Sequence, residues 1–598
     1  MIRRCLLPLT FAGRWLASPD PARAAIFYVG APGDTDCHFT DVQEAIDHAE
    51  TVPGADVIRL VYTRAYPDTS LWIDDSGDLN IVGGYDNCSD GTASGGYSVL
   101  DGTGGSGYPI IGVGGTGTVK LRYLALYNNS GYGLAVQCPG CTVELLNTSI
   151  RNNGVAQGGG RGVHVSPGCD GPCPNAPILR IGAYVDISDN RSQICAGVFA
   201  GDAIVDMSDA AYSRIANNVA GLYGGGLCLW GASVGLIGGQ ISGNTAGTYG
   251  GGVAVFHSSA LLMYPTNPAF PPTISGNTAA QGGGIAVLTA YGSDFPQHPT
   301  VNGWDAVITG NRATYGAGVY LLNQFEGDNS VNLCLRAMRA MPEVGGICPF
   351  SPPVSAVACT QPWSCNRVAN NVAVFPEGLK SLGAAVMSVG PRTHVHLAHA
   401  TVTGNSGWSL IGHDDADIPS SGATMRIEDS LLADNDLAYA VVFDRFMQET
   451  RIRRTTIAGN GALPFRMHDS TVFDIGDSLV WEPGYTTLVR SGTNTIVSHM
   501  VLASEVVSIV ASSSVLATTD PRFLDAANGN YRLRPDSPAV DYSNTTAGYH
   551  DLDGYVRGID LPGALDRFGP RDLGAFERQP GVYGVHDVIF ADGFDPAT

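Results

Sequence analysis

One segment of the sequence occurs twice, 33 residues apart, as ISGNTAGTYGGGVAV at 241–255 and ISGNTAAQGGGIAV at 274–287. Shorter versions recur along the chain, and the shortest spacings between them are about 25 residues. An internal repeat of this length is typical of a solenoid, in which stacked turns bury a core that no single turn can bury. The repeated asparagine is found at Asn129, Asn153, Asn190, Asn218, Asn244, Asn277, Asn311, Asn371, Asn405, Asn435 and Asn460.

The residues before each asparagine follow a regular pattern. Apolar residues fall 10, 8 and 3 positions before it, as at Val234, Leu236 and Ile241. The first two alternate as in a strand with one buried face, and the third starts a new strand after a corner. We expect the asparagine to take the left-handed conformation of a corner and to hydrogen-bond to the asparagines of neighbouring turns. The pattern predicts an all-β, right-handed parallel β-helix of about 14 turns.

The ends of the chain differ from the repeats. The stretch FTDVQEAIDHAE at 39–50 predicts an amphipathic helix that caps the N-terminal end of the coil. The first residues have the basic start, the apolar stretch and the small-residue cleavage site of an export signal. The predicted parts are a signal peptide at 1–24, the cap and first turns at 25–118, β-helix repeats at 119–515 with a disulfide-linked insertion at 323–369, a distinct C-terminal segment at 520–577 and a tail at 578–598.

The charge of the chain limits its partners. There are 33 basic and 55 acidic residues, so the formal net charge is −22. This argues against nucleic acid as a partner, because phosphates are neutralised by Lys and Arg. No stretch of the sequence resembles a membrane span of about 20 apolar residues. We expect a secreted or cell-surface protein, and the sequence predicts no oligomeric state.

The cysteines favour disulfides. Twelve of the 13 cysteines follow the predicted signal peptide, and an even number in an exported protein is typical of disulfide pairs. CPGC and CDGPC each follow a predicted strand, so we expect two local disulfides there, with a zinc site of Cys138, Cys141, Cys169 and Cys173 as the alternative. The predicted disulfide cysteines are Cys37, Cys88, Cys138, Cys141, Cys169, Cys173, Cys195, Cys228, Cys334, Cys348, Cys359 and Cys365.

The repeat pattern also predicts charged columns on one outer face. Nine positions before successive asparagines are His396, Arg426 and Arg451, and six positions before are His399, Asp429 and Arg454; Glu428 and Arg453 lie between them. Such a patch is a candidate for binding an acidic sugar or abstracting a proton. The alternative is a solvated sheet face with cross-strand ion pairs.

Three parts of the sequence resemble known families. The capping helix followed by LDG at 100–102 resembles the pectin-lyase-like superfamily, and the Asn and Gly-Gly pattern is similar to repeats of bacterial polymorphic outer-membrane proteins. The motifs DPRF, GNYRL, SPAVD, DLDG and GAFE at 520–577 resemble, in order, the C-terminal segment of bacterial choice-of-anchor Q proteins. These resemblances imply a β-helix and a location at the surface of a bacterium.

A further resemblance bears on catalysis. GHDDAD at 412–417 and RIR at 451–453 resemble parts of a polygalacturonase site, although its other motifs, N-T-D and G-H-G, are missing. The candidate catalytic residues are Asp414, Asp415, Asp429 and Arg451.

We therefore expect an exported, adhesin-like protein without catalysis that binds a polysaccharide or a surface or matrix component. The alternative is a polysaccharide lyase or glycoside hydrolase. No cofactor is expected, with Ca²⁺ at DLDG (551–554) as the alternative.

Overall fold

The structure is a computed structural model. It describes residues 24–580 except 75–76, 106, 170–174, 208–211, 268, 291–295, 326, 338–347, 349–365, 375–381, 416–421, 493, 510–513, 518, 547, 549 and 565. The predicted signal peptide, apart from its last residue, and all but the start of the predicted tail lie outside these ranges.

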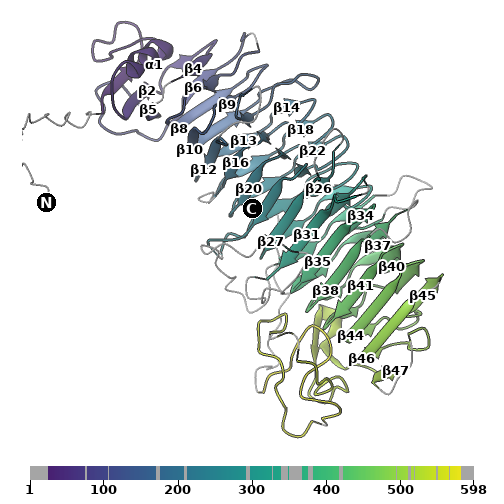
Figure 1. Ribbon diagram of the computed structural model, residues 1–598. Helices are drawn as coiled ribbons and strands as arrows, with labels where there is room; N and C mark the ends of the chain where they lie inside the picture. Colours follow the sequence, from purple (N-terminus) through teal and green to yellow (C-terminus); the bar gives the residue numbers. More distant parts are fainter. Residues whose placement is uncertain are drawn as a thin grey trace, which may run out of the picture.

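The chain winds into a parallel β-helix, as predicted (Figure 1). A typical turn contains β20 (Ser233–Leu236), β21 (Gln240–Ser242), β22 (Thr245–Ala246) and β23 (Val253–Phe256). Three of these pair in parallel with β24 (Ala260–Met263), β25 (Thr273–Ser275) and β26 (Ile285–Leu288) of the next turn. The two copies of the repeated segment are therefore adjacent turns.

Three ladders of stacked strands run along the coil. The first extends from β1 (Ile26–Val29) to β46 (Thr495–Ala503), and the second from β3 (Ala65–Tyr66) to β47 (Val515–Ala517). The third passes through 14 strands from β4 (Leu71–Ile73) to β45 (Leu488–Ser491), in agreement with the predicted number of turns.

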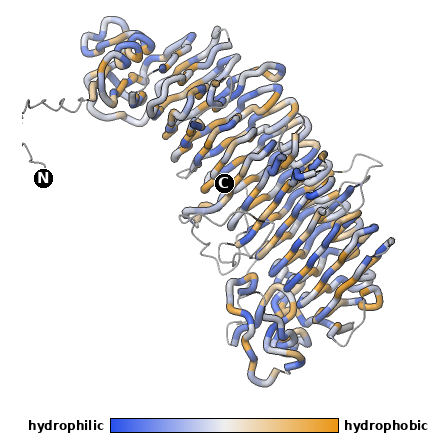
Figure 2. Tube along the Cα trace, viewed as in Figure 1, coloured by the Kyte–Doolittle hydropathy of each residue, from blue (hydrophilic) through white to orange (hydrophobic). Residues whose placement is uncertain are grey.

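The core lies inside the coil. The apolar positions of the repeat face inward, and Val234, Leu236 and Ile241 are fully buried. Apolar residues recur in rows from turn to turn (Figure 2), and one continuous cluster extends from Phe27 to Ile509. The stability of each turn thus depends on its neighbours.

The predicted capping helix is present as α1 (Val42–Glu50) at the N-terminal end of the coil. The Asp41 carboxylate accepts hydrogen bonds from the first backbone amides, Gln43 N at 2.8 Å and Glu44 N at 3.0 Å. Ala45 and Ile46 are fully buried against the first turns.

The eleven repeated asparagines form one continuous hydrogen-bonded ladder. Asn277 is typical: its Oδ1 accepts from the backbone N and the Nδ2 of Asn244, at 2.9 and 3.0 Å. Its Nδ2 donates to the Ile241 carbonyl and to Asn311 Oδ1, both at 3.0 Å. Because the side chain bonds to strands of two neighbouring turns, the asparagine fastens the turns together.

The expected backbone conformation of these asparagines was wrong. The left-handed residue is the one just before each asparagine, such as Asn217 (φ 55°), Gly243 (φ 65°), Gly276 (φ 63°) and Asp434 (φ 53°). These are the residue types that tolerate positive φ best. The asparagine itself is selected for its buried amide.

The corner glycines give a testable prediction. A Cβ at Gly276 would meet no atom closer than 3.9 Å, so only its positive φ opposes substitution. We expect Gly276→Ala to lower the free energy of unfolding by about 1–2 kcal/mol, and Gly276→Asn to have a much smaller effect. Urea titration of both variants measures this, and equal losses would show that the backbone conformation does not decide the residue here.

The predicted insertion is shorter than expected. Strands β31 (Val331–Arg336) and β32 (Asn366–Ala369) lie within 323–369 and belong to the first and second ladders. Most of the remaining residues of the predicted insertion, 338–347 and 349–365, lie outside the described residues. A strand was missed here because its apolar pattern is not followed by an asparagine at the usual distance.

Disulfides join cysteines at several levels of the coil. The described pairs are Cys37–Cys88, Cys138–Cys141, Cys195–Cys228 and Cys334–Cys348. Since Cys138 and Cys141 are bonded to each other, they are not free for the alternative zinc site. Cys169 is also disulfide-bonded, whereas Cys173, Cys359 and Cys365 lie outside the described residues.

The chain from residue 520 to residue 580, called the C-terminal segment below, folds back beside the last turns (Figure 1). It contains the antiparallel pair β48 (Phe523–Asp525) and β49 (Asn530–Leu533), separated by the short helix η1 (Ala526–Asn528). Among the described residues, none of the helices has the length and apolar character needed to cross a membrane.

Candidate functional site

The first predicted charged column lies in register on the outer face of the first ladder. His396, Arg426 and Arg451 are direct cross-strand neighbours. Two carboxylates that sequence reasoning missed accompany them: Glu449 lies 3.6 Å from Arg426 and 2.6 Å from Arg451, and Asp474 lies 3.6 Å from Arg451. Both arginines therefore take part in cross-strand ion pairs, whereas His396 is only 3% exposed.

The residues between the two columns are also paired. Arg453 contacts Asp474, and Glu428 lies 3.2 Å from Arg454. Asp474 is the cross-strand neighbour of Arg451 and therefore the next residue of the first column, so the strand register predicts that it lies near both Arg451 and Arg453.

The second predicted column is not an open surface. His399, Asp429 and Arg454 have positive φ values at the corner between the first and second ladders. Asp429 and Arg454 are only 3% and 6% exposed, because the C-terminal segment covers them. His399 also contacts this segment, with its Nε2 at 3.2 Å from the His550 carbonyl. Their expected role in binding an external ligand is therefore replaced by an internal one.

Asp429 joins the coil to the C-terminal segment. It accepts hydrogen bonds from Arg454 Nε at 2.9 Å and from Arg557 Nε at 3.1 Å. Arg557 also donates to the Gly574 and Ala575 carbonyls, both at 3.0 Å. Burial by itself would raise the pKa of Asp429, but the two guanidinium groups hold it below its usual value. Asp429 is thus a charged anchor between two parts of the chain.

The candidate catalytic residues do not form one site. Asp414 lies on β37 (Ser406–Asp414) of the third ladder and pairs with Arg445 at 3.3 Å. Asp429 lies at the far end of the next first-ladder strand, β38 (Thr424–Glu428), whose five residues span about 16 Å. Asp415 is 5% exposed beside Asp414, and Arg451 lies on the outer face of the first ladder. The polygalacturonase-like constellation is therefore absent from these residues.

The carboxyl groups of DLDG have protein partners. Asp553 pairs with Arg532 through bonds of 2.6 and 2.5 Å, and Asp551 accepts from the Tyr555 and Glu577 amides at 2.7 and 2.8 Å. Both carboxyl groups therefore have hydrogen-bond or ion-pair partners within the C-terminal segment. Within the described ranges, the one cluster with the spacing of metal ligands contains Cys37 and Cys88, which form a disulfide.

Asp551 predicts a pH dependence. Burial, followed by the charge of Asp553, raises the pKa of Asp551 to about 8. An unfolded Asp titrates at about 3.9, so the folded state binds more protons between these values and stability falls as the pH rises from 5 to 8. We expect Asp551→Asn to reduce this fall by at least about 1.4 kcal/mol, the equivalent of one pKa unit. Urea unfolding across this range measures it; an unchanged slope, as expected for the exposed Asp566→Asn, would contradict the assignment.

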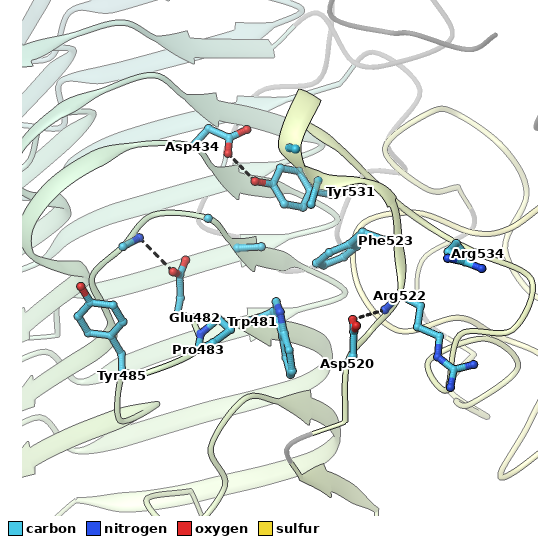
Figure 3. A pocket seen from close by; sticks show the side chains of 15 residues that line it. Asp434, Trp481, Glu482, Pro483, Tyr485, Asp520, Arg522, Phe523, Tyr531 and Arg534 are labelled. Atoms are coloured by element: carbon cyan, nitrogen blue, oxygen red, sulfur yellow. Dashed lines mark hydrogen bonds between the residues drawn. The ribbon is translucent and has the colours of Figure 1, made fainter. Parts of the chain in front are cut away.

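A cavity of about 760 Å³ opens where the C-terminal segment meets the coil. Trp481, Glu482 and Tyr485 extend from the coil, and Phe523 and Tyr531 from the C-terminal segment (Figure 3). Aromatic rings and carboxyl groups thus face one space from both sides. The lining consists of Asp434, Ala458, Gly459, Gly461, Trp481, Glu482, Pro483, Tyr485, Asp520, Arg522, Phe523, Ala526, Ala527, Tyr531 and Arg534.

Glu482 connects this pocket to the asparagine ladder. Its Oε1 accepts from the backbone N and the Nδ2 of Asn460, both at 2.8 Å, and its Oε2 accepts from Gly461 N at 3.1 Å. Glu482 therefore takes the place of the next asparagine, and its own backbone N donates to Ser504 Oγ of the following turn at 3.2 Å. Burial raises its pKa, the three N–H donors oppose this, and the nearby Asp434 adds to the rise.

Asp434 lies on the coil wall of the pocket, as Glu482 does, and precedes the ladder residue Asn435. The Tyr531 hydroxyl donates to Asp434 Oδ1, and Gly459 allows this contact because a Cβ there would lie 2.3 Å from that hydroxyl. Burial raises the pKa of Asp434, although the Tyr531 hydrogen bond opposes the rise. The carboxyl groups of the pocket can accept hydrogen bonds from a polar ligand, and its aromatic rings can contact an apolar face of the same ligand.

The sequence gives only a weak signal for this pocket. Its coil residues come from corners of three different turns, and its other wall comes from the motif region DPRF to GNYRL. No protein-family profile matches the chain, and no curated protein is significantly similar to it.

Proposed function

We propose that this chain is an exported, adhesin-like protein that binds polysaccharide in the pocket between the coil and the C-terminal segment. The observation that carries the proposal is the lining of the pocket, which contains the rings of Trp481, Tyr485 and Phe523 together with the carboxyl groups of Asp434 and Asp520. A sugar ring presents apolar C–H groups to aromatic faces and hydroxyl donors to carboxylates.

Two further features support export to a bacterial surface. Disulfides at several levels of the coil are typical of oxidising compartments. The motif order of the C-terminal segment resembles that of choice-of-anchor Q proteins, which implies a cell-surface protein. In this proposal the segment also completes the binding pocket.

The test is retention of the protein on a panel of immobilised neutral and acidic polysaccharides. We expect the wild-type protein to bind at least one of them, and Trp481→Ala to weaken that binding about tenfold or more, as for a buried aromatic anchor. Trp72→Ala is the control, because Trp72 is an exposed tryptophan on β4 (Leu71–Ile73), at the other end of the coil from the pocket. Equal retention of both variants would contradict the assigned site.

A glycoside hydrolase is the second candidate, for one reason. Asp434 and Glu482 are two carboxyl groups that line the same pocket, and a pair of carboxyl groups supplies the acid and the base of glycoside hydrolysis. The same panel is therefore assayed for reducing ends. Release of product that disappears in Asp434→Asn would assign the chemistry to this pocket and replace the binding proposal.

A further inference from the structure

Arg161 lies in an aromatic setting on the outer side of the third ladder, just before β11 (Val163–Ser166). Its guanidinium carbon is 4.8 Å from the ring centre of Phe199 and 5.8 Å from that of Tyr132. The His164 ring stacks on Phe199 at 5.1 Å and lies 5.3 Å from Tyr132. The planar guanidinium is therefore held over aromatic rings rather than free in solvent.

Arg161 has no acidic partner among the described residues, whereas two arginines of the first and second ladders nearby do. Arg180 pairs with Glu144 at 2.9 Å, and Arg214 pairs with Asp186 at 3.0 Å. The described hydrogen bonds of Arg161 go instead from Nε and Nη2 to the Gly159 carbonyl, at 3.3 and 3.2 Å. A half-buried cation without a counter-ion is unfavourable, and it is unexpected in a chain with a net charge of −22.

Arg161 is the positively charged group among Tyr132, Arg161, His164 and Phe199, because His164 is neutral. Burial, followed by the charge of Arg161, lowers the pKa of His164 to about 4, so His164 is uncharged at pH 7. His164 Nε2 lies 3.0 Å from the Ser166 hydroxyl. The Nη1 group of Arg161 makes no hydrogen bond within the described part of the chain, which leaves two N–H donors for an incoming oxyanion.

We propose that Arg161, together with the rings of Tyr132, His164 and Phe199, is a binding site for an oxyanion of a polysaccharide, that is, a carboxylate or sulfate group. The guanidinium donates to the oxyanion, and the neighbouring rings contact the sugar that carries it. The inference rests on the proposed function, since it specifies the charge of the polysaccharide.

This site is separate from the pocket at the other end of the coil. Arg161 precedes β11, and the pocket residues Gly459 and Gly461 precede β43 (Leu463–His468). Nine steps of the third ladder separate these strands, a distance of about 43 Å. The two sites can therefore be tested independently.

The experiment compares polysaccharides that differ only in charge. Wild-type protein is passed over immobilised alginate and carboxyl-reduced alginate, and over dextran sulfate and dextran, at fixed salt concentration. We expect stronger retention on alginate, on dextran sulfate or on both than on the neutral counterpart, and the arm that responds identifies the group as carboxylate or sulfate. Arg161→Gln should reduce that retention about tenfold or more, whereas Arg180→Gln, the matched control, should not.

Several outcomes would overturn the inference. These are equal retention of charged and neutral polymers by the wild-type protein, no retention of either polyanion, or undiminished retention by Arg161→Gln. Thermal unfolding shows whether Arg161→Gln is folded. If it is not, Arg161→Lys replaces it, because lysine keeps the charge but loses the planar donor geometry, and unchanged retention in that variant would contradict the site.

The same panel separates this inference from the pocket proposal. If only the pocket assignment fails, Trp481→Ala binds as well as the wild-type protein, while Arg161→Gln still loses the preference for charged polymers. If only the Arg161 site fails, Arg161→Gln keeps the wild-type charge dependence, while Trp481→Ala loses binding.

Discussion

Replacing Asn277 with alanine is expected to lower the free energy of unfolding by about 3–5 kcal/mol, as expected when several buried polar groups lose their partners. Asn277 is fully buried and makes four side-chain hydrogen bonds to neighbouring turns. The variant leaves the Asn244 amide groups, the Ile241 carbonyl and the Asn311 side chain with fewer partners in the buried interior of the coil.

The measurement is urea unfolding followed by circular dichroism and by tryptophan fluorescence. Two probes are needed because a solenoid can unfold in parts. Thr278→Ala is the matched control, since Thr278 is the exposed neighbour of Asn277, and it should change stability by less than about 0.5 kcal/mol. A loss below about 1 kcal/mol for Asn277→Ala would mean that the ladder contributes little to the stability of the coil.

The ladder could be predicted because its physical cause is repeated in the sequence. A polar residue that recurs next to buried apolar positions in every turn must have buried partners, and in a parallel stack those partners are the same residue in the next turn. The end of the ladder could not be predicted. Glu482 replaces an asparagine where the local motif is no longer present, and Glu is ordinarily a surface residue.

The repeat pattern led to the wrong residue for the left-handed backbone conformation. Gly, Asn and Asp precede the repeated asparagines, but the asparagine itself was more regular and was given the positive φ. The two roles, a turn residue and a buried amide, are performed by adjacent residues. The sequence does distinguish the two positions. The residue before each repeated asparagine varies among Gly, Asn and Asp, as a turn residue does, whereas the following residue is always asparagine.

The charged columns were predicted in the correct register, but their surroundings were not. Register follows from the repeat spacing alone, so His396, Arg426 and Arg451 could be stacked from the sequence. The cover over Asp429 could not, because its partner Arg557 is 128 residues away in a segment without the repeat. The pocket could not be predicted for the same reason, because one of its walls belongs to the coil and the other to the C-terminal segment.

Arg557→Ala is expected to release the C-terminal segment from the coil and to abolish binding in the pocket. Arg557 is only 4% exposed, and its removal leaves Asp429 with one guanidinium partner, takes the Arg557 donor from the Gly574 carbonyl and leaves the Ala575 carbonyl with the Leu552 amide alone. Removing one partner of a buried ion pair typically destabilises a protein by 3–5 kcal/mol. The contact to β38 and the pocket should therefore be lost together.

Limited proteolysis measures the release, because cleavage after residue 503 should become rapid in the variant while the coil remains resistant. Arg567→Ala is the matched control, since Arg567 is an exposed arginine of the same segment. Polysaccharide retention is measured on the same samples. If Arg557→Ala were cleaved rapidly but still bound polysaccharide like the wild-type protein, the coil residues alone would form the site. The pocket proposal requires both losses, because Phe523 and Tyr531 of the C-terminal segment form one wall of the pocket and Arg557 joins this segment to Asp429 of the coil.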